Sequence, residues 1–281
     1  MGLIASVVQM SSSDNFEDNL NTASRLIAEA KAEGANLVLL PENFYFMGRS
    51  TERFKFIEHL GSGVLQAFLS EQAQKNEIVL VGGTIPLYPD VDLDLDLNSD
   101  SHSSERILSC CSVFAADGSY IAHYNKIHLF DVVVPGGESH QESAIFMPGH
   151  EVVIAKTNIA KLGLSICYDL RFPELFRQLA KLKVQILTVP AAFTYVSGQA
   201  HWHTLLKARA IENQCYVLAA NQCGQHNHKF KTYGHSLIID PWGNIVAEAD
   251  DCSVGVCTAK IDLDYQAELR TSFPVLEHRV L

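Results

Sequence analysis

The hydrophobic and polar positions at the start of the chain predict a strand, a helix and a second strand. Residues 3–8 are mostly apolar, which is typical of a buried strand, and residues 35–41 repeat that pattern. Between them, Asp14 is the predicted N-cap of a helix and Gly34 its C-terminal stop. The apolar residues of this helix recur at helical spacing: Phe16, Leu20, Ala23, Leu26, Ile27 and Ala30. Glu42 therefore lies just past the carboxyl end of a strand.

The same alternation continues along the chain and predicts an α/β sandwich. Asp117-Gly118 marks a hairpin between strands at 106–114 and 120–124, and Pro241-Trp242-Gly243 turns into a strand at 245–248. Further strands are predicted at 78–82, 152–154, 161–166, 185–189, 216–221 and 236–240, with helices at 63–75, 173–183 and 201–213. Many strands and few helices favour two sheets packed face to face with helices outside, rather than an open doubly wound sheet. No linker divides the chain, so we expect one domain over residues 1–281.

The segment 88–104 interrupts this regular pattern. It contains Pro89, an alternating run of Asp and Leu, and a cluster of Ser and Asp. Such a segment is either an edge strand or an acidic surface loop, and its proline and polar cluster favour the loop.

Composition excludes several classes of function. The formal net charge of −11 repels phosphate backbones and anionic lipid, so nucleic acid and membrane surfaces are not expected partners. The apolar start lacks the basic region of a secretory signal, and no apolar run reaches the roughly 18 residues of a membrane helix. The seven cysteines are scattered without a CxxC pair, which argues against disulfides and zinc sites. We therefore expect a soluble cytoplasmic protein with reduced thiols.

Cys167 is the best candidate nucleophile in the sequence. A strand pattern ends directly before it and a helix begins at Pro173, so the thiol stands in a strand-to-helix turn, where backbone N–H groups face a substrate. The alternative is a buried structural cysteine. The polar and charged run Tyr168-Asp169-Leu170-Arg171 argues against that alternative, because core thiols rarely have such neighbours.

Three other ionisable residues have the surroundings that a nucleophilic thiol requires. Glu42 sits between an apolar strand and the aromatic run Phe44-Tyr45-Phe46, where desolvation suits a general base, although a helix cap would look the same. Lys126 is one cation in a mostly apolar stretch and is predicted to stabilise an oxyanion and to favour the thiolate, unless it is an ordinary surface lysine. Glu142 reads by itself as a loop acid. None of the twelve histidines has a context that singles it out as the base.

Taken together, these segments resemble the nitrilase superfamily of carbon-nitrogen hydrolases. Leu40-Pro41-Glu42 matches the glutamate motif of that family, residues 124–130 its lysine motif and residues 166–174 its cysteine motif. The resemblance implies a four-layer αββα sandwich, association into a homodimer or larger assembly, and no metal or organic cofactor. It assigns Glu42 as base, Cys167 as nucleophile, and Lys126 with the Tyr168 backbone N–H as oxyanion donors. It also matches Glu142 to a second glutamate that holds the lysine and the substrate.

Within the superfamily, the segments 200–216, 222–224 and 233–236 look most like the Nit branch. Members of that branch hydrolyse deaminated glutathione or, as omega-amidases, 2-oxoglutaramate, so the expected substrate is a small amide that carries a carboxylate. Arg171 is the candidate clamp for this carboxylate, the alternative being an ion pair with Glu174 or Asp169. Phe193 and Thr194 are expected to line the pocket, together with Tyr195 and His201.

Residue identity leaves other activities open. A nitrilase or an N-carbamoyl amino acid hydrolase would use the same residues. A catalytically silent scaffold protein is a further alternative. The intact set of Glu42, Lys126 and Cys167 argues against it, because a scaffold does not need a base, a cation and a thiol together.

Overall fold

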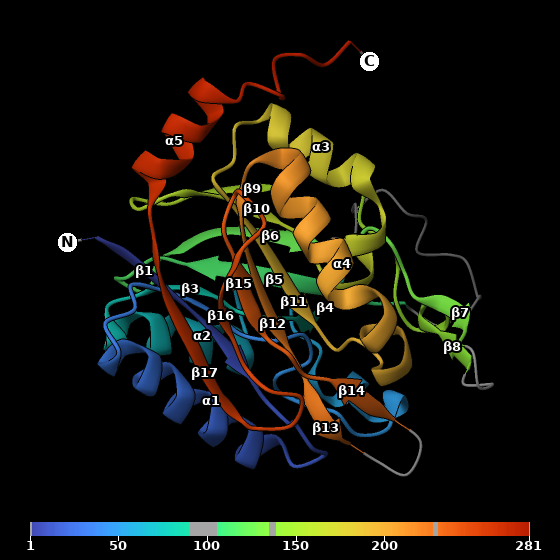
Figure 1. Ribbon diagram of the computed structural model, residues 1–281. Helices are drawn as coiled ribbons and strands as arrows, with labels where there is room; N and C mark the ends of the chain where they lie inside the picture. The colour runs from blue at the N-terminus through green and yellow to red at the C-terminus, as the bar shows by residue number, and fades with distance from the viewer. Residues whose placement is uncertain (1, 90–105, 135–138, 227–229, 281) are drawn as a thin grey trace, which may run out of the picture.

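The computed structural model describes residues 2–89, 106–134, 139–226 and 230–280, and it consists of two β-sheets that lie face to face (Figure 1). The first sheet has the order β17-β1-β2-β3-β5-β4, with β6 paired to β5. Strands β1, β2 and β3 are parallel, and the other pairs are antiparallel. The bounds are β1 Leu3–Gln9, β2 Leu37–Leu39, β3 Val79–Val81, β4 Ile85–Leu87, β5 Leu108–Phe114, β6 Tyr120–Asn125 and β17 Gly255–Ile261.

The second sheet has the order β16-β15-β12-β11-β10-β9, in which β10, β11 and β12 are parallel. Its strands are β9 Ile154–Lys156, β10 Lys161–Leu164, β11 Ile186–Ala191, β12 Tyr216–Asn221, β15 Leu237–Ile239 and β16 Ile245–Glu248. Two small antiparallel hairpins stand apart from both sheets: β7 Asp131–Val133 with β8 Ser139–Gln141, and β13 Cys223–Gln225 with β14 Lys231–Tyr233.

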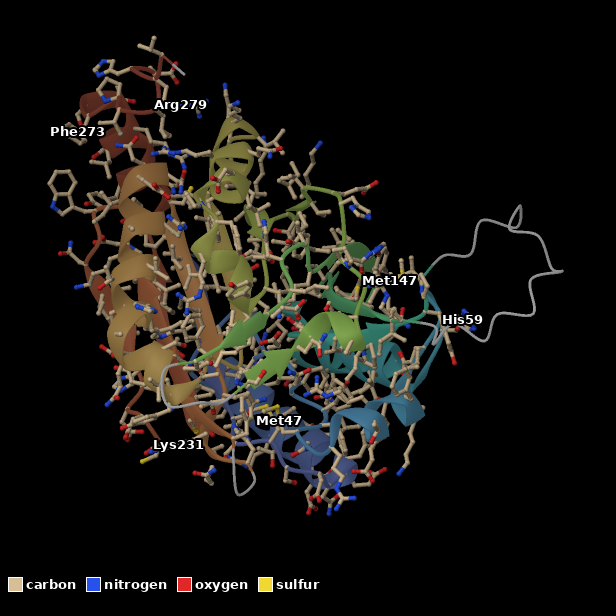
Figure 2. All side chains as sticks on the ribbon, turned by 90° about the vertical axis from the view of Figure 1, so that its right-hand side faces the viewer. Met47, His59, Met147, Lys231, Phe273 and Arg279 are labelled. Atoms are coloured by element: carbon tan, nitrogen blue, oxygen red, sulfur yellow. The ribbon has the colours of Figure 1, made fainter. Side chains whose placement is uncertain are left out.

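Helices cover the outer face of each sheet, which produces the predicted four layers. In β2, Leu37 and Leu39 belong to the core between the sheets, whereas Val38 packs into the core under α1 and α2, as the two-residue period of a strand requires. The other sheet packs against α3 and α4, and α5 lies beyond them near the C-terminus (Figure 1; Figure 2 shows Phe273 at the outer edge). The helices are α1 Phe16–Ala32, α2 Val64–Asn76, α3 Pro173–Lys181, α4 Tyr195–Asn213 and α5 Leu263–Ser272, with 3₁₀ segments η1 Ser50–Phe56, η2 Glu142–Ala144 and η3 Cys167–Arg171.

The structure corrects the sequence predictions at several points. The N-cap of α1 is Asn15, whose side-chain oxygen accepts the Asp18 N–H at 3.2 Å, and not Asp14. Helix α4 begins at Tyr195 rather than at residue 201. The strands β4 and β17, the two small hairpins and α5 were not predicted. The predicted acidic loop at 88–104 falls outside the described residues from position 90 onward. Within the described part of the chain, no helix combines the length and apolarity needed to cross a membrane.

Candidate active site

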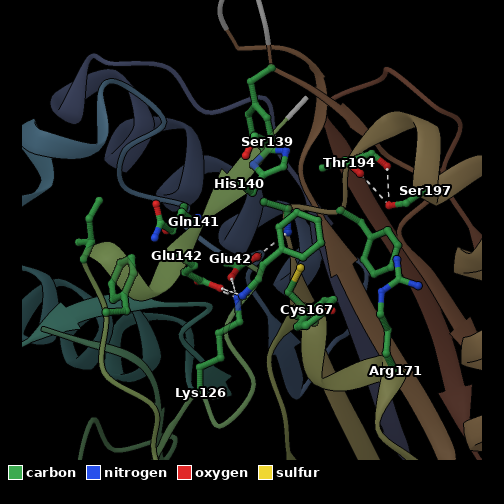
Figure 3. Close-up of a pocket in the computed structure, with 18 of the residues that line it drawn as sticks. Glu42, Lys126, Ser139, His140, Gln141, Glu142, Cys167, Arg171, Thr194 and Ser197 are labelled. Carbon is green, nitrogen blue, oxygen red and sulfur yellow. Dashed lines mark hydrogen bonds and ion pairs between the residues drawn. The ribbon is translucent and has the colours of Figure 1, made fainter. Parts of the chain in front are cut away.

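Cys167 occupies a sharp turn between β10 and α3. Its φ is +44°, a left-handed conformation that is strained for a residue with a side chain and that recurs at functional turns. The residue opens η3, and Pro173 then begins α3 at the first helical position, which proline tolerates because the N–H it lacks has no helical acceptor. This backbone turns the sulfur of Cys167 away from the sheet and toward the pocket (Figure 3).

Asp169 fixes this turn through hydrogen bonds. Its buried carboxylate accepts the Ile166 N–H at 2.8 Å and the Tyr124 hydroxyl at 2.8 Å. It also accepts the His128 N–H at 3.0 Å and lies 2.7 Å from Nδ1 of that ring. One carboxylate therefore ties the turn that carries Cys167 to the segment after β6 that carries Lys126. Sequence reasoning considered Asp169 only as a charged neighbour of Cys167 and a possible partner of Arg171, because Tyr124 and His128 lie more than forty residues away in the chain.

Lys126 lies between two carboxylates at the base of the pocket. Its Nζ donates to Glu42 Oε1 at 2.9 Å and to Glu142 Oε1 at 2.8 Å (Figure 3). The exposed fraction is 2% for Lys126 and 4% for Glu42, so this array is shielded from solvent. The second carboxylate oxygens are also bonded: Glu42 Oε2 accepts the Ala192 N–H at 2.8 Å, and Glu142 Oε2 accepts the Phe130 N–H at 2.7 Å. The lysine is an internal cation and not an ordinary surface residue.

The electrostatics of this array keep the lysine charged and the thiol protonated. Burial lowers the pKa of Lys126, but the charges of Glu142 and Glu42 outweigh burial and hold the pKa well above its ordinary value. Burial raises the pKa of Cys167 well above its ordinary value, and the Glu42 carboxylate raises it further. The Lys126 charge and the Ala192 N–H lower it by less. Lys126 thus favours the thiolate, as expected, but does not prevail in the free protein, so reaction requires a base.

The pocket gathers all eight residues that the sequence singled out. It is a cavity of about 290 Å³ lined by Glu42, Lys126, Glu142, Cys167, Tyr168, Arg171, Phe193 and Thr194. Thr194 Oγ1 lies 2.7 Å from Ser197 Oγ at the start of α4. Tyr195 and His201, which were also considered, are not among the lining residues, although His201 contacts Arg171.

Arg171 does not form an ion pair with Glu174 or Asp169, which was the alternative to its role as a carboxylate clamp. Among the described residues, neither Asp169 nor Glu174 pairs with it, because Asp169 is occupied by its own donors. Its guanidinium carbon lies 5.1 Å from the ring centre of Phe193 and 5.7 Å from that of Tyr168. Nη1 lies 3.1 Å from His201 Nδ1. The guanidinium is therefore held by aromatic contacts at the pocket wall and keeps its charge available for an anion.

Sequence reasoning missed six polar residues of the pocket wall: Asn43, Arg53, Ser139, His140, Gln141 and Ser197. Asn43 directly follows Glu42 and Arg53 lies in η1, and the two are joined by a hydrogen bond of 3.0 Å. Nothing in the local pattern sets Arg53 apart from its neighbours Arg49 and Lys55. Its place in the pocket depends on how η1 packs, which no local sequence signal reveals.

A group of potential metal ligands, which the sequence did not suggest, lies outside the pocket. His203 Nε2 and His235 Nδ1 contact Glu248 Oε1 at 2.7 Å and 2.9 Å, and the three residues come from α4, the turn after β14 and β16. The pKa of Glu248 is lowered because the bonds and charges of both rings outweigh the burial of the carboxylate. These side chains satisfy one another's hydrogen-bonding groups, so the three residues form a hydrogen-bonded cluster.

Comparison with known proteins agrees with this geometry. The family model described as carbon-nitrogen hydrolase matches residues 4–271. A deaminated glutathione amidase of Synechocystis is 40% identical over 279 residues, which cover 99% of this chain and 98% of that protein. The structure of Saccharomyces cerevisiae Nit3, described as a member of branch 10 of the nitrilase superfamily, is 32% identical, with a TM-score of 0.84 and coverage of 99% and 97%. The C. elegans NitFhit protein is 38% identical, also with a TM-score of 0.84, and the chain spans 66% of its length.

Proposed function

The chain belongs to the carbon-nitrogen hydrolase family, and on that premise we propose that it hydrolyses deaminated glutathione at the 2-oxoglutaramyl amide bond. It is an amidase of the nitrilase superfamily. The observation that carries the proposal is the buried array in which Lys126 bridges Glu42 and Glu142 beside the thiol of Cys167. The name of the 40% identical Synechocystis relative supports the choice of substrate.

Catalysis begins, in this proposal, with proton transfer from Cys167 to Glu42. The raised pKa of the thiol keeps it protonated until a substrate carbonyl is in place, so the base acts during the attack. The thiolate then adds to the amide carbon and forms a tetrahedral oxyanion. Lys126 stabilises this oxyanion together with the N–H of Tyr168, which lies in the first turn of η3, where a helix N–H has no helical acceptor.

Collapse of the intermediate breaks the carbon-nitrogen bond and leaves a thioester on Cys167. Glu42 returns its proton to the departing amine. The same carboxylate then takes a proton from water, which attacks the thioester and releases the acid and the free thiol. Glu142 holds Lys126 from the opposite side throughout, because its second oxygen is fixed by the Phe130 N–H at 2.7 Å. The scheme assigns every proton transfer and the oxyanion stabilisation to side chains and a backbone N–H.

Substrate recognition is assigned to the wall of the pocket opposite Lys126. We propose that Arg171 binds a carboxylate of the substrate, since its planar fork can donate two parallel hydrogen bonds. Phe193 supports the guanidinium from one side and, with Tyr168 and Thr194, shapes the space around the substrate chain. Arg171 has no ion pair within the described ranges of the chain, which supports this role.

A panel of substrates tests the proposal. Release of ammonia or amine is measured with deaminated glutathione, 2-oxoglutaramate, an N-carbamoyl amino acid and a nitrile, for the natural protein and for Cys167→Ala. We expect deaminated glutathione to be the best substrate, and its turnover to vanish in Cys167→Ala because the nucleophile is gone. Preference for 2-oxoglutaramate would make the protein an omega-amidase. Preferred turnover of the nitrile or of the N-carbamoyl amino acid would assign a different reaction to the same residues. No turnover of any compound would favour the scaffold alternative.

We also propose that the protein forms a homodimer or larger homo-oligomer. Three large apolar side chains, Trp242, Phe273 and Ile211, are 54%, 52% and 51% exposed. The rings of Trp242 and Phe273 lie 5.8 Å apart, and the backbone of Gly243 lies against Ile211. These contacts make one apolar patch across α4, α5 and the β15–β16 turn, and a second copy of the chain is its proposed partner.

Light scattering tests the assembly. Trp242→Glu is expected to shift the mass from a multiple of 31.0 kDa to the 31.0 kDa of one chain, because a charge in an apolar interface opposes association. The control is Val64→Glu, an apolar position that is still more exposed, at 66%, and lies at the start of α2 on the other helical layer. A natural protein that is monomeric, or a Trp242→Glu variant that keeps the larger mass, would refute this patch as the interface.

A cytoplasmic location remains part of the proposal. All seven cysteines are free, and two adjacent ones, Cys110 and Cys111, are fully buried. Free thiols in such number are typical of reducing compartments.

A further inference from the structure

The pocket holds two guanidinium groups that lack a carboxylate partner. Arg53 and Arg171 both line it, and neither forms an ion pair within the described part of the chain. The third cation of the pocket, Lys126, is already bound by two carboxylates. The uncompensated positive charge of the site therefore resides on the two arginines.

The two guanidinium groups belong to different parts of the pocket wall. Arg53 comes from η1 and contacts Asn43, which directly follows the base Glu42. Arg171 comes from η3 and contacts Tyr168, Phe193 and His201, which belong to the second half of the chain. No contact joins the two arginines to each other. The two guanidinium groups are therefore held by different segments of the pocket wall.

Arg53 is held ready for a ligand by its surroundings. Asn43 has a φ of +56°, a conformation that asparagine tolerates, and its N–H donates to Thr84 Oγ1 at 2.9 Å. The Asn43 side-chain oxygen thereby meets Arg53 Nη1 at 3.0 Å. The Nε of Arg53 is buried and has no hydrogen-bond partner among the described residues. A buried donor without an acceptor is costly, and an anion bound to this guanidinium would supply acceptors.

We propose that Arg53 is a second anion subsite and that the substrate of this pocket is an amide with two carboxylates, one for each arginine. The inference rests on the proposed function and sharpens it. Deaminated glutathione carries a 2-oxo acid carboxylate at one end and a peptide carboxylate at the other. The omega-amidase substrate 2-oxoglutaramate carries only one. The pair of arginines therefore selects the longer, doubly charged amide.

Binding to an inactive protein tests the subsite independently of turnover. In the Cys167→Ala background, titration calorimetry compares deaminated glutathione with its analogue in which the peptide carboxylate is a carboxamide. We expect the acid to bind about tenfold to a hundredfold more tightly, the range typical of hydrogen bonds to a charged group. Adding Arg53→Met should bring this ratio close to one. Arg53→Lys should restore part of it, because lysine keeps the charge but lacks the planar fork.

The matched control is Lys55→Met, which removes an exposed cation from the same 3₁₀ segment and should keep the full ratio. Equal binding of the two ligands by Cys167→Ala, which needs no change at Arg53, would overturn the inference, as would a ratio that survives Arg53→Met. The proposed function fails separately: a binding preference without turnover by the natural protein would leave the subsite standing and refute the amidase activity on this substrate.

Discussion

Lys126→Met is expected to lower kcat/KM by about a hundredfold to a thousandfold and to destabilise the fold at neutral pH by about 3–5 kcal/mol. The catalytic loss follows from removal of the proposed oxyanion donor. The loss of stability follows from the two carboxylates that lysine bridges at 2.9 Å and 2.8 Å. Without the cation, the buried Glu42 and the partly buried Glu142 remain beside each other with like charges and no counter-ion.

The pH dependence of the stability of Lys126→Met distinguishes uncompensated carboxylates from a simple packing defect. Removing the cation leaves Glu42 and Glu142 in mutual repulsion, with no counter-ion between them at neutral pH. Acid neutralises carboxylates in general and so relieves repulsion of this kind. In the natural protein the raised pKa of Lys126 means that its own contribution is lost only in strongly alkaline solution. The stability difference between the two proteins should therefore shrink as the pH falls.

Urea unfolding of both proteins at pH 5 and pH 8 measures this difference. Lys260→Met is the control, since it removes an exposed lysine whose nearest carboxylate, Asp262, is 3.6 Å away at the surface. A deficit for Lys126→Met that is the same at both pH values would mean lost packing rather than uncompensated carboxylates. If Lys126→Met is as stable as the natural protein at pH 8, then the Lys126 cation does not stabilise the array of carboxylates.

The centre of the site was predictable because its residues stand at strand ends. Glu42 follows β2, Lys126 follows β6 and Cys167 follows β10. The parallel strands of each sheet end at one edge, and an α/β layer binds its ligands beyond the carboxyl ends of its strands. A sequence pattern that identifies a strand therefore also shows that the polar residue after it lies at this edge of the sheet. The chemistry proposed for the glutamate, the lysine and the cysteine rests on their residue types.

The parts that escaped prediction depend on contacts between distant segments. Helix α4 begins at Tyr195 and includes Gly198, where any side chain would collide with Tyr233 of β14. Strand β17 has no clean alternation of buried and exposed residues, and it is a strand because it pairs along its whole length with β1. Arg53 likewise enters the pocket only through η1. Local propensity carries no signal for such placements.

Glu42→Gln is expected to separate two properties that usually change together, namely turnover and thiol reactivity. Turnover should fall by about a hundredfold to ten-thousandfold, because glutamine cannot accept the proton of Cys167. Alkylation of Cys167 by iodoacetamide at pH 8 should become faster. The Glu42 charge is one cause of the raised thiol pKa, whereas Lys126 and the Ala192 N–H, which lower it, remain in the variant.

The size of the alkylation effect follows from the thiolate fraction. Each unit by which the pKa falls gives about tenfold more thiolate while the pKa still exceeds the pH. Lower basicity reduces the nucleophilicity of that thiolate, which leaves a net acceleration of roughly threefold to fourfold per unit. Mass spectrometry of the labelled peptides measures the rate at each cysteine. The buried thiols supply an internal reference, because burial raises the pKa of Cys110 to about 12 and that of Cys215 to about 11, and neither contacts Glu42.

Two other results would require a different account of the site. If turnover and the alkylation rate of Glu42→Gln both fall, then Glu42 activates the thiol before substrate binds. The mechanism would then start from a thiolate that is already formed and ion-paired, and not from general-base attack. If turnover persists, another group accepts the proton, and Glu142, the second carboxylate on Lys126, is the residue placed to do so at 2.8 Å from the same ammonium. Glu142→Gln in the Glu42→Gln background would then abolish what remained. The expected opposite movement of the two rates leaves Glu42 as the base and Lys126 as the cation that turns from bridging two carboxylates to stabilising an oxyanion.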